Sequence, residues 1–239
     1  MSLSIHEFST SGEADIALAA DIERVLRAAL EARGQAALAV SGGSTPRRLY
    51  ERLSGLELDW SRISVVLADE RWVEPGEAGS NESFIRAALL QNAAAHARFY
   101  PLKTSHSNPR AAAPAVSERL ATCPLPFDVV VLGMGSDGHT LSWFPEASGL
   151  DAALEAQGPL AAPISAHPSA VTGAHPERLT LTRAALEGAR FVALLIHGQE
   201  KASVLAEAQS PGAVTAMPVR ALIRDPAIDL QVYAAPAPA

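Results

Sequence analysis

Stretches of helical periodicity alternate with short, continuous apolar runs along this chain. The first long helix is predicted over about residues 13–33, where Gly34 ends it. Apolar residues recur on one face of this helix at the spacing i, i+3, i+4, i+7, i+8: Ile22, Val25, Leu26, Ala29 and Leu30. Short apolar runs predict buried strands at 36–40, 63–68, 127–132 and 191–196.

Further helices are predicted at 46–53, at 80–90 with Ser80 and Asn81 at its start, at 109–120 and at 200–208. Alternating residues predict strands at 179–182 and at 229–233, the latter as a closing edge strand. Residues 149–176, rich in Ala, Pro and Gly, are expected to be irregular. This order predicts an α/β fold, a Rossmann-like open, mostly parallel sheet with helices on both faces, formed as a single domain over residues 1–239.

Composition narrows the class of protein. The 239 residues are 48% hydrophobic and 19% charged, which is typical of a globular chain. The net charge of −7 argues against a general nucleic-acid binder. Cys123 is the single cysteine, so no internal disulfide and no cysteine-based metal cluster are expected. Without a recognisable signal peptide or membrane span, the chain is expected to be cytoplasmic.

The strand at 127–132 leads into a glycine-rich loop that holds Asp137 and His139. Ligands bind at the carboxyl ends of strands in open α/β sheets, so this is a candidate site. Histidine suits proton transfer near neutral pH, and Asp137 is placed to orient it. The alternative is a histidine that only satisfies loop hydrogen bonds. Residues 133–138 also match the dinucleotide motif G-x-G-x-x-G, but Pro145 interrupts the long helix which that motif requires.

A second candidate loop follows the strand at 36–40. It consists of Ser41, Gly42, Gly43, Ser44 and Thr45, with Pro46 at the predicted start of the next helix and Thr45 as its N-cap. Free amide groups at a helix N-terminus bind phosphate well. An ordinary capped turn explains the same residues, and the loop alone does not decide between the two.

Charged residues follow other strands. Asp69, Glu70 and Arg71 come after the strand at 63–68, at the same predicted edge of the sheet. Lys201 stands where a strand gives way to a helix and is placed to neutralise a phosphate, although a surface lysine is the commoner case. Arg178 is equally ambiguous. The other histidines, at 6, 96, 106, 167, 175 and 197, are interpreted as structural. Metal-ligand spacing is absent from the sequence, so no catalytic metal is expected.

Together these segments resemble the 6-phosphogluconolactonase family, within the wider group of glucosamine-6-phosphate isomerases and deaminases. The matching segments are 41–46, 69–71 with 80–81, 133–140 with Ser142 and 144–145, 178–182 and 198–201. The resemblance implies hydrolysis of 6-phosphoglucono-δ-lactone to 6-phosphogluconate, without a cofactor.

The resemblance also implies residue roles. His139 would be the base, Asp137 its partner and Arg71 the group that stabilises the oxyanion. The phosphate would bind Ser41, Gly42, Gly43, Ser44 and Thr45 with help from Lys201 and Arg48; Asp69 and Asn81 would contact sugar hydroxyls, and Arg178 completes the substrate-binding set. Expected partners are the sugar phosphate lactone alone, with neither nucleic acid nor membrane, for a monomer or small homo-oligomer.

Two alternatives stay open. A glucosamine-6-phosphate deaminase/isomerase of the same fold would use Asp69 as a base between C1 and C2, but the sequence Asp-Glu-Arg and the ending Ser-Trp-Phe-Pro favour the lactonase branch. A sugar-phosphate sensor would keep the phosphate loop without turnover. Such a sensor has little reason to keep Asp137 and His139 together.

Overall fold

The computed structural model describes residues 2–237. Its strands are β1 (Ser2–Glu7), β2 (Ala36–Val40), β3 (Ile63–Leu67), β4 (Asp69–Arg71), β5 (Arg98–Tyr100), β6 (Val129–Leu132), β7 (Ala161–Ser165), β8 (Glu177–Leu181), β9 (Val192–His197) and β10 (Asp229–Ala235). Its α-helices are α1 (Ser11–Arg33), α2 (Arg47–Ser54), α3 (Asn81–Ala88), α4 (Pro109–Leu120), α5 (Leu150–Leu154), α6 (Gln199–Gln209) and α7 (Arg220–Ile223). Short 3₁₀ helices occupy Trp60–Arg62, Asn92–His96 and Ala184–Leu186.

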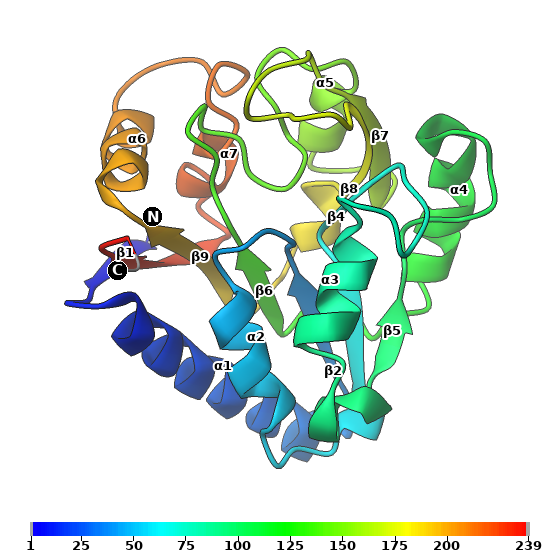
Figure 1. The fold of residues 1–239 in the computed structure, drawn as a ribbon, viewed down its shortest axis with the longest axis vertical. Helices are drawn as coiled ribbons and strands as arrows, with labels where there is room; N and C mark the ends of the chain where they lie inside the picture. The colour runs from blue at the N-terminus through cyan, green and yellow to red at the C-terminus, as the bar shows by residue number, and fades with distance from the viewer. Residues whose placement is uncertain (1, 238–239) are drawn as a thin grey trace.

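Seven strands form the central sheet in the order β1-β10-β9-β6-β2-β3-β5, and every neighbouring pair is parallel. Strands β2, β3 and β6 are buried along their whole length, which explains their unbroken apolar sequences. In Figure 1, α1 and α2 lie on one side of this sheet, and α6 and α7 lie on the other. The predicted α/β fold with a mostly parallel sheet is therefore confirmed.

A second sheet was not predicted. It has three antiparallel strands in the order β4-β8-β7 and lies beside α4 and α5 at the upper right of Figure 1. Residues 69–71 are thus a strand of their own and not the end of the preceding one. Segment 149–176, expected to be irregular, contributes α5 and β7 to this part of the molecule.

The edges of the central sheet also differ from the prediction. Strand β10 is not an edge strand, because β1 pairs with it in parallel from Ser2↔Asp229 to Glu7↔Ala234. The edges are β1 and β5, and neither strand was predicted from the sequence. Among the described residues, no helix combines the length and apolar character that crossing a membrane requires.

The helix termini follow the local sequence. Thr10 caps α1 by accepting a hydrogen bond from the Glu13 N–H at 3.2 Å, and Gly34 ends the helix in the left-handed conformation with φ of 72°. Asn108 caps α4, where Pro109 takes the first helical position. The predicted boundaries of both helices are close to the observed ones.

A buried carboxylate joins β2 and β6 at the end of the sheet where these strands begin. Asp128 is fully buried and accepts a hydrogen bond from the Ala37 N–H at 2.9 Å. It also forms ion pairs with Arg33 and Arg190. These contacts stabilise the pairing of the two central strands.

The Asp128→Asn variant should therefore be less stable than the wild type by about 1–3 kcal/mol, because the amide cannot replace the charge that faces two arginines. Urea unfolding followed by circular dichroism measures this difference. A midpoint equal to that of the wild type would contradict the role given to Asp128.

Candidate active site

A cavity of about 560 Å³ opens at the edge of the central sheet where β2, β6 and β9 end. The loops after these strands line it, together with Asp69, Arg71, Asn81 and Arg178. The loop after β2 stays in register with β6, since the Ser41 N–H donates to the Val131 carbonyl at 3.1 Å. Parallel pairing therefore brings together loops that are far apart in the sequence.

The loop after β2 carries the predicted phosphate-binding residues. Residues 41–45 all line the cavity, and α2 begins just beyond them at Arg47. The predicted cap is wrong, because Pro46 occupies the N-cap position and no side chain caps α2. The Ser41 hydroxyl is buried without a hydrogen-bond partner in the described part of the chain. This loop therefore presents free polar groups to the cavity.

His139 and Asp137 form a close pair in the loop after β6. The His139 Nδ1 lies 2.6 Å from Asp137 Oδ1, which also accepts the His139 backbone N–H at 3.1 Å. Burial raises the pKa of Asp137, but the hydrogen bonds and charge of His139 outweigh it and bring that pKa below its ordinary value. Because Nδ1 faces the carboxylate, Nε2 is the nitrogen left for a ligand. His139 lines the cavity, and Asp137 supports it from behind.

The glycines of this loop serve the His–Asp pair. A Cβ at Gly135 would lie 2.0 Å from His139 Nδ1 and 2.6 Å from Asp137 Oδ1. Gly138 has φ of 77°, a conformation that favours glycine. The loop does not open a long helix; α5 begins only at Leu150. Gly135 is therefore required by the packing of His139 and Asp137, Gly138 by its backbone conformation, and the long helix of the dinucleotide motif does not follow.

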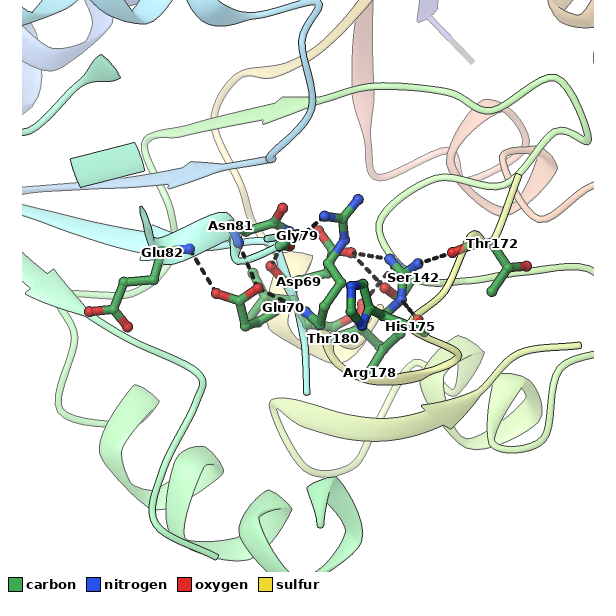
Figure 2. A network of polar contacts seen from close by, with 12 residues as sticks. Asp69, Glu70, Gly79, Asn81, Glu82, Ser142, Thr172, His175, Arg178 and Thr180 are labelled. Atoms are coloured by element: carbon green, nitrogen blue, oxygen red, sulfur yellow. Dashed lines mark hydrogen bonds and ion pairs between the residues drawn. The ribbon is translucent and has the colours of Figure 1, made fainter. Parts of the chain in front are cut away.

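Asp69 is the centre of a buried polar network, shown in Figure 2. Its Oδ1 accepts from the Asn81 side-chain amide at 3.1 Å, and its Oδ2 accepts from the Ser142 hydroxyl at 2.5 Å. The Arg178 guanidinium lies 3.9 Å from Oδ2. Each oxygen of Asp69 thus accepts one hydrogen bond within the protein and has a second acceptor site for a ligand in the cavity.

Antiparallel pairing of β4 with β8 places Arg71 directly opposite Arg178. Arg71 Nη1 donates to the Gly79 carbonyl at 2.5 Å, while its Nε is buried without a partner among the described residues. Arg178 donates to the carbonyls of His175 and Thr172, each at 2.7 Å. Burial lowers the pKa of Arg178, and the nearby Arg71 adds to this, whereas Asp69 opposes it. Arg178 therefore holds the cavity wall, and Arg71 keeps one nitrogen unused.

The remaining predicted cations differ in position. Lys201, in the first turn of α6, lines the cavity. Burial lowers its pKa, while Glu200 and Asp137 act in the opposite direction. Arg48 does not line the cavity; its side chain is 65% exposed and its Nε lies 3.9 Å from Asp15. The structure thus groups Lys201 with the site but places Arg48 in a separate depression.

His197 was not predicted to belong to the site. It is the last residue of β9 and lines the cavity, and its Nε2 is buried without a partner in the described chain. Burial lowers its pKa, helped by the charge of Arg48. Its place at the carboxyl end of a buried strand was the sequence signal from which it could have been predicted.

Groups of three or more His, Cys, Asp or Glu side chains able to hold a metal ion do not occur between residues 2 and 237.

Comparison with known proteins places this geometry in a family. The model of the glucosamine-6-phosphate isomerases/6-phosphogluconolactonase family matches residues 9–230. The chain belongs to this family.

A 6-phosphogluconolactonase of Rhizobium meliloti is 44% identical over 236 residues, which cover 99% of this chain and 100% of the relative. One from Pseudomonas aeruginosa is 45% identical over 214 residues, 87% of this chain and 86% of the relative. The crystal structure of a 6-phosphogluconolactonase from Shewanella baltica has a TM-score of 0.92 and 41% identity, and the match covers 97% of each chain. Family membership thus agrees with the resemblance found in the sequence.

Gly42 offers a direct test of the cavity. A Cβ at this position would lie 1.9 Å from the Asn81 side-chain oxygen, so Gly42→Ala should displace the amide from Asp69 and distort the loop after β2. We expect a loss of affinity for 6-phosphogluconate of about tenfold or more, measured by calorimetry. Gly55→Ala is the control, because the nearest atom to its Cβ would be at 3.8 Å. Equal affinity in both variants would contradict the proposed contact.

Proposed function

We propose that this chain hydrolyses 6-phospho-D-glucono-1,5-lactone to 6-phospho-D-gluconate, with His139 as the general base. Its close relatives over nearly the whole chain are named 6-phosphogluconolactonases, which supports a lactone hydrolase of the oxidative pentose phosphate pathway. The single observation that carries the mechanism is the 2.6 Å contact between His139 Nδ1 and Asp137 at the cavity wall.

The His–Asp pair suits water activation. Asp137 holds the proton on Nδ1, so that Nε2 takes a proton from the water that attacks C1 of the lactone. The bond between C1 and the ring oxygen then breaks, and His139 returns the proton to that oxygen. A lactone is an activated ester, so a positioned base and charge stabilisation are sufficient for this chemistry.

Arg71 stabilises the negative charge that develops on the C1 oxygen. Arg71 lines the cavity, and its buried Nε has no hydrogen-bond partner among the described residues, so that this nitrogen is a preorganised donor. Asp69 and Asn81 lie on the same wall and contact hydroxyl groups of the sugar. Arg178 contributes by keeping this wall in place.

The phosphate binds at the loop of residues 41–45. The backbone N–H groups of this loop and the N-terminus of α2 favour an anion. Lys201 adds a positive charge to the cavity, and His197, which ends the strand before α6, also lines it. The lactone ring then spans the distance from this loop to His139.

The deaminase alternative is disfavoured because the relatives that match nearly the whole chain are named 6-phosphogluconolactonases. The sequence Asp-Glu-Arg at 69–71 and the ending Ser-Trp-Phe-Pro at 142–145 also favour the lactonase branch. The sensor alternative leaves the His139–Asp137 pair without a purpose.

We further propose that the enzyme acts in the cytoplasm, as a monomer or small homo-oligomer.

Removing the base tests the mechanism. His139→Ala should lower kcat for freshly prepared 6-phosphogluconolactone by about 10²–10⁴, since general base catalysis contributes a factor of that size. Acid release at constant pH, corrected for spontaneous hydrolysis, measures the rate. Unchanged turnover in the variant would be consistent with a lactonase but would show that a residue other than His139 is the base. If the wild type does not hydrolyse the lactone, or if it releases ammonia from glucosamine 6-phosphate, the proposed lactonase activity is refuted.

Removing only the charge behind the base should have a smaller effect. In Asp137→Asn the partner of Nδ1 becomes an amide, so the imidazole is held less firmly and its protonated form is less stabilised. We expect kcat to fall by about 10- to 100-fold, less than in His139→Ala. Since His139 keeps its pocket, KM should change little. A variant with full kcat would show that Asp137 does not support the base.

A further inference from the structure

Glu70 is a buried carboxylate that the mechanism does not use. It is the middle residue of β4 and is 0% exposed, whereas its neighbours Asp69 and Arg71 line the cavity. A carboxylate is costly to bury unless hydrogen bonds satisfy it. The partners of Glu70 therefore indicate why the acid is kept there.

Both oxygens of Glu70 accept hydrogen bonds from the chain around the site. Oε1 accepts the backbone N–H of Arg71 at 2.8 Å and that of Asn81 at 2.7 Å. Oε2 accepts the N–H of Glu82 at 2.7 Å and the Ser80 hydroxyl at 3.4 Å. Figure 2 shows the Glu70 carboxylate beside the start of α3. One side chain thus ties together the two ends of segment 72–80.

The residues at these two ends belong to the site. Arg71 precedes the segment and lines the cavity; Asn81 follows it and donates to the Asp69 carbonyl at 2.8 Å and to its side chain at 3.1 Å. The Asn81 amide also packs so closely on Gly42 that a Cβ there would clash. A change at Glu70 would therefore reach the oxyanion-stabilising arginine, the sugar-binding wall and the phosphate loop together.

We propose that Glu70 is a positioning residue, which holds Arg71 and Asn81 at the distance that lactone hydrolysis requires. The inference rests on the proposed function, because its effect is defined by turnover of the lactone. Glu70 itself does not touch the substrate; it acts through the backbone of the residues that do.

The chemistry calls for a carboxylate at this position. Four donors converge on it, and an ionised carboxylate has acceptor sites for all of them. A glutamine has a single acceptor oxygen, and its NH₂ group would face an N–H donor. Burial raises the pKa of Glu70 to about 7, while the backbone N–H groups of Asn81, Glu82 and Arg71 act in the opposite direction. Assays at pH 8 therefore examine the ionised form.

Contacts outside the site hold the middle of the same segment. Lys103 pairs with Glu74 at 2.7 Å and lies over the Trp72 ring, 4.6 Å from its centroid. The Gly76 N–H donates to the Ser83 hydroxyl at 2.7 Å. These contacts keep the segment folded when Glu70 is changed, so that Glu70→Gln should alter the positions of its ends more than the fold.

The test is a double-mutant cycle on kcat/KM for the lactone at pH 8, with wild type, Glu70→Gln, Arg71→Ala and the double variant. Glu70→Gln alone should lower kcat/KM by about 10- to 100-fold, as expected when reacting groups are displaced. If Glu70 acts through Arg71, its substitution should have a much smaller effect in the Arg71→Ala background. A purely structural role predicts that the two losses multiply.

Asp128→Asn is the matched control, because it also neutralises a buried carboxylate bound to a backbone N–H, but at the opposite end of the sheet. It should lower stability and leave kcat/KM unchanged. Glu70→Asp replaces Glu70→Gln in the cycle if the latter does not fold. The positioning role would be overturned if the losses in kcat/KM of the two single variants multiply in the double variant, or if Glu70→Gln has the kcat/KM of the wild type. Either result would leave the proposed lactonase activity standing. If the wild-type protein does not turn over the lactone, both the proposed function and the positioning role of Glu70 are overturned.

Discussion

The parallel pairing of β2, β6 and β9 is the constraint on which the site depends. These strands are buried on both faces, and their apolar side chains fix the register that aligns Val131 with Val40 and Ala193. As a consequence, the loops that follow all emerge at one edge of the sheet. The phosphate loop, the His139 loop and the start of α6 are brought together by the core packing of the strands that precede them.

The small antiparallel sheet adds the second wall of the cavity. Pairing of β4 with β8 sets Asp69, Arg71 and Arg178 side by side; Asp69 and Arg178 are buried, Arg71 is half-buried, and each is met by a partner of opposite charge or by a carbonyl. Such a network is stable only when its members are satisfied together. The loops after the central strands therefore carry the proposed base and anion site, and the small sheet supplies charged side chains that line the same cavity.

Much of this arrangement could be predicted, because periodicity marks buried strands and long helices. The glycine-rich loops were recognisable since each follows such a strand. Other features depend on pairing between distant segments, which local pattern does not reveal: β1 pairs with β10, and β4 pairs with β8. For the same reason the contacts of Glu70, in β4, were not predicted. His197 was not predicted although it ends a strand that the sequence marks, and Arg48, predicted in the site, lies 3.9 Å from Asp15 and does not line the cavity.

The most direct measurement is the crystal structure of the protein bound to 6-phosphogluconate, the product of the proposed reaction. The account predicts the phosphate on the backbone amides of residues 42–45 and the C1 carboxylate within hydrogen-bonding distance of His139 Nε2, with Arg71 beside it. A product bound in the reverse orientation, or with C1 remote from His139, would contradict the central claim that this edge of the sheet is built for water attack at C1.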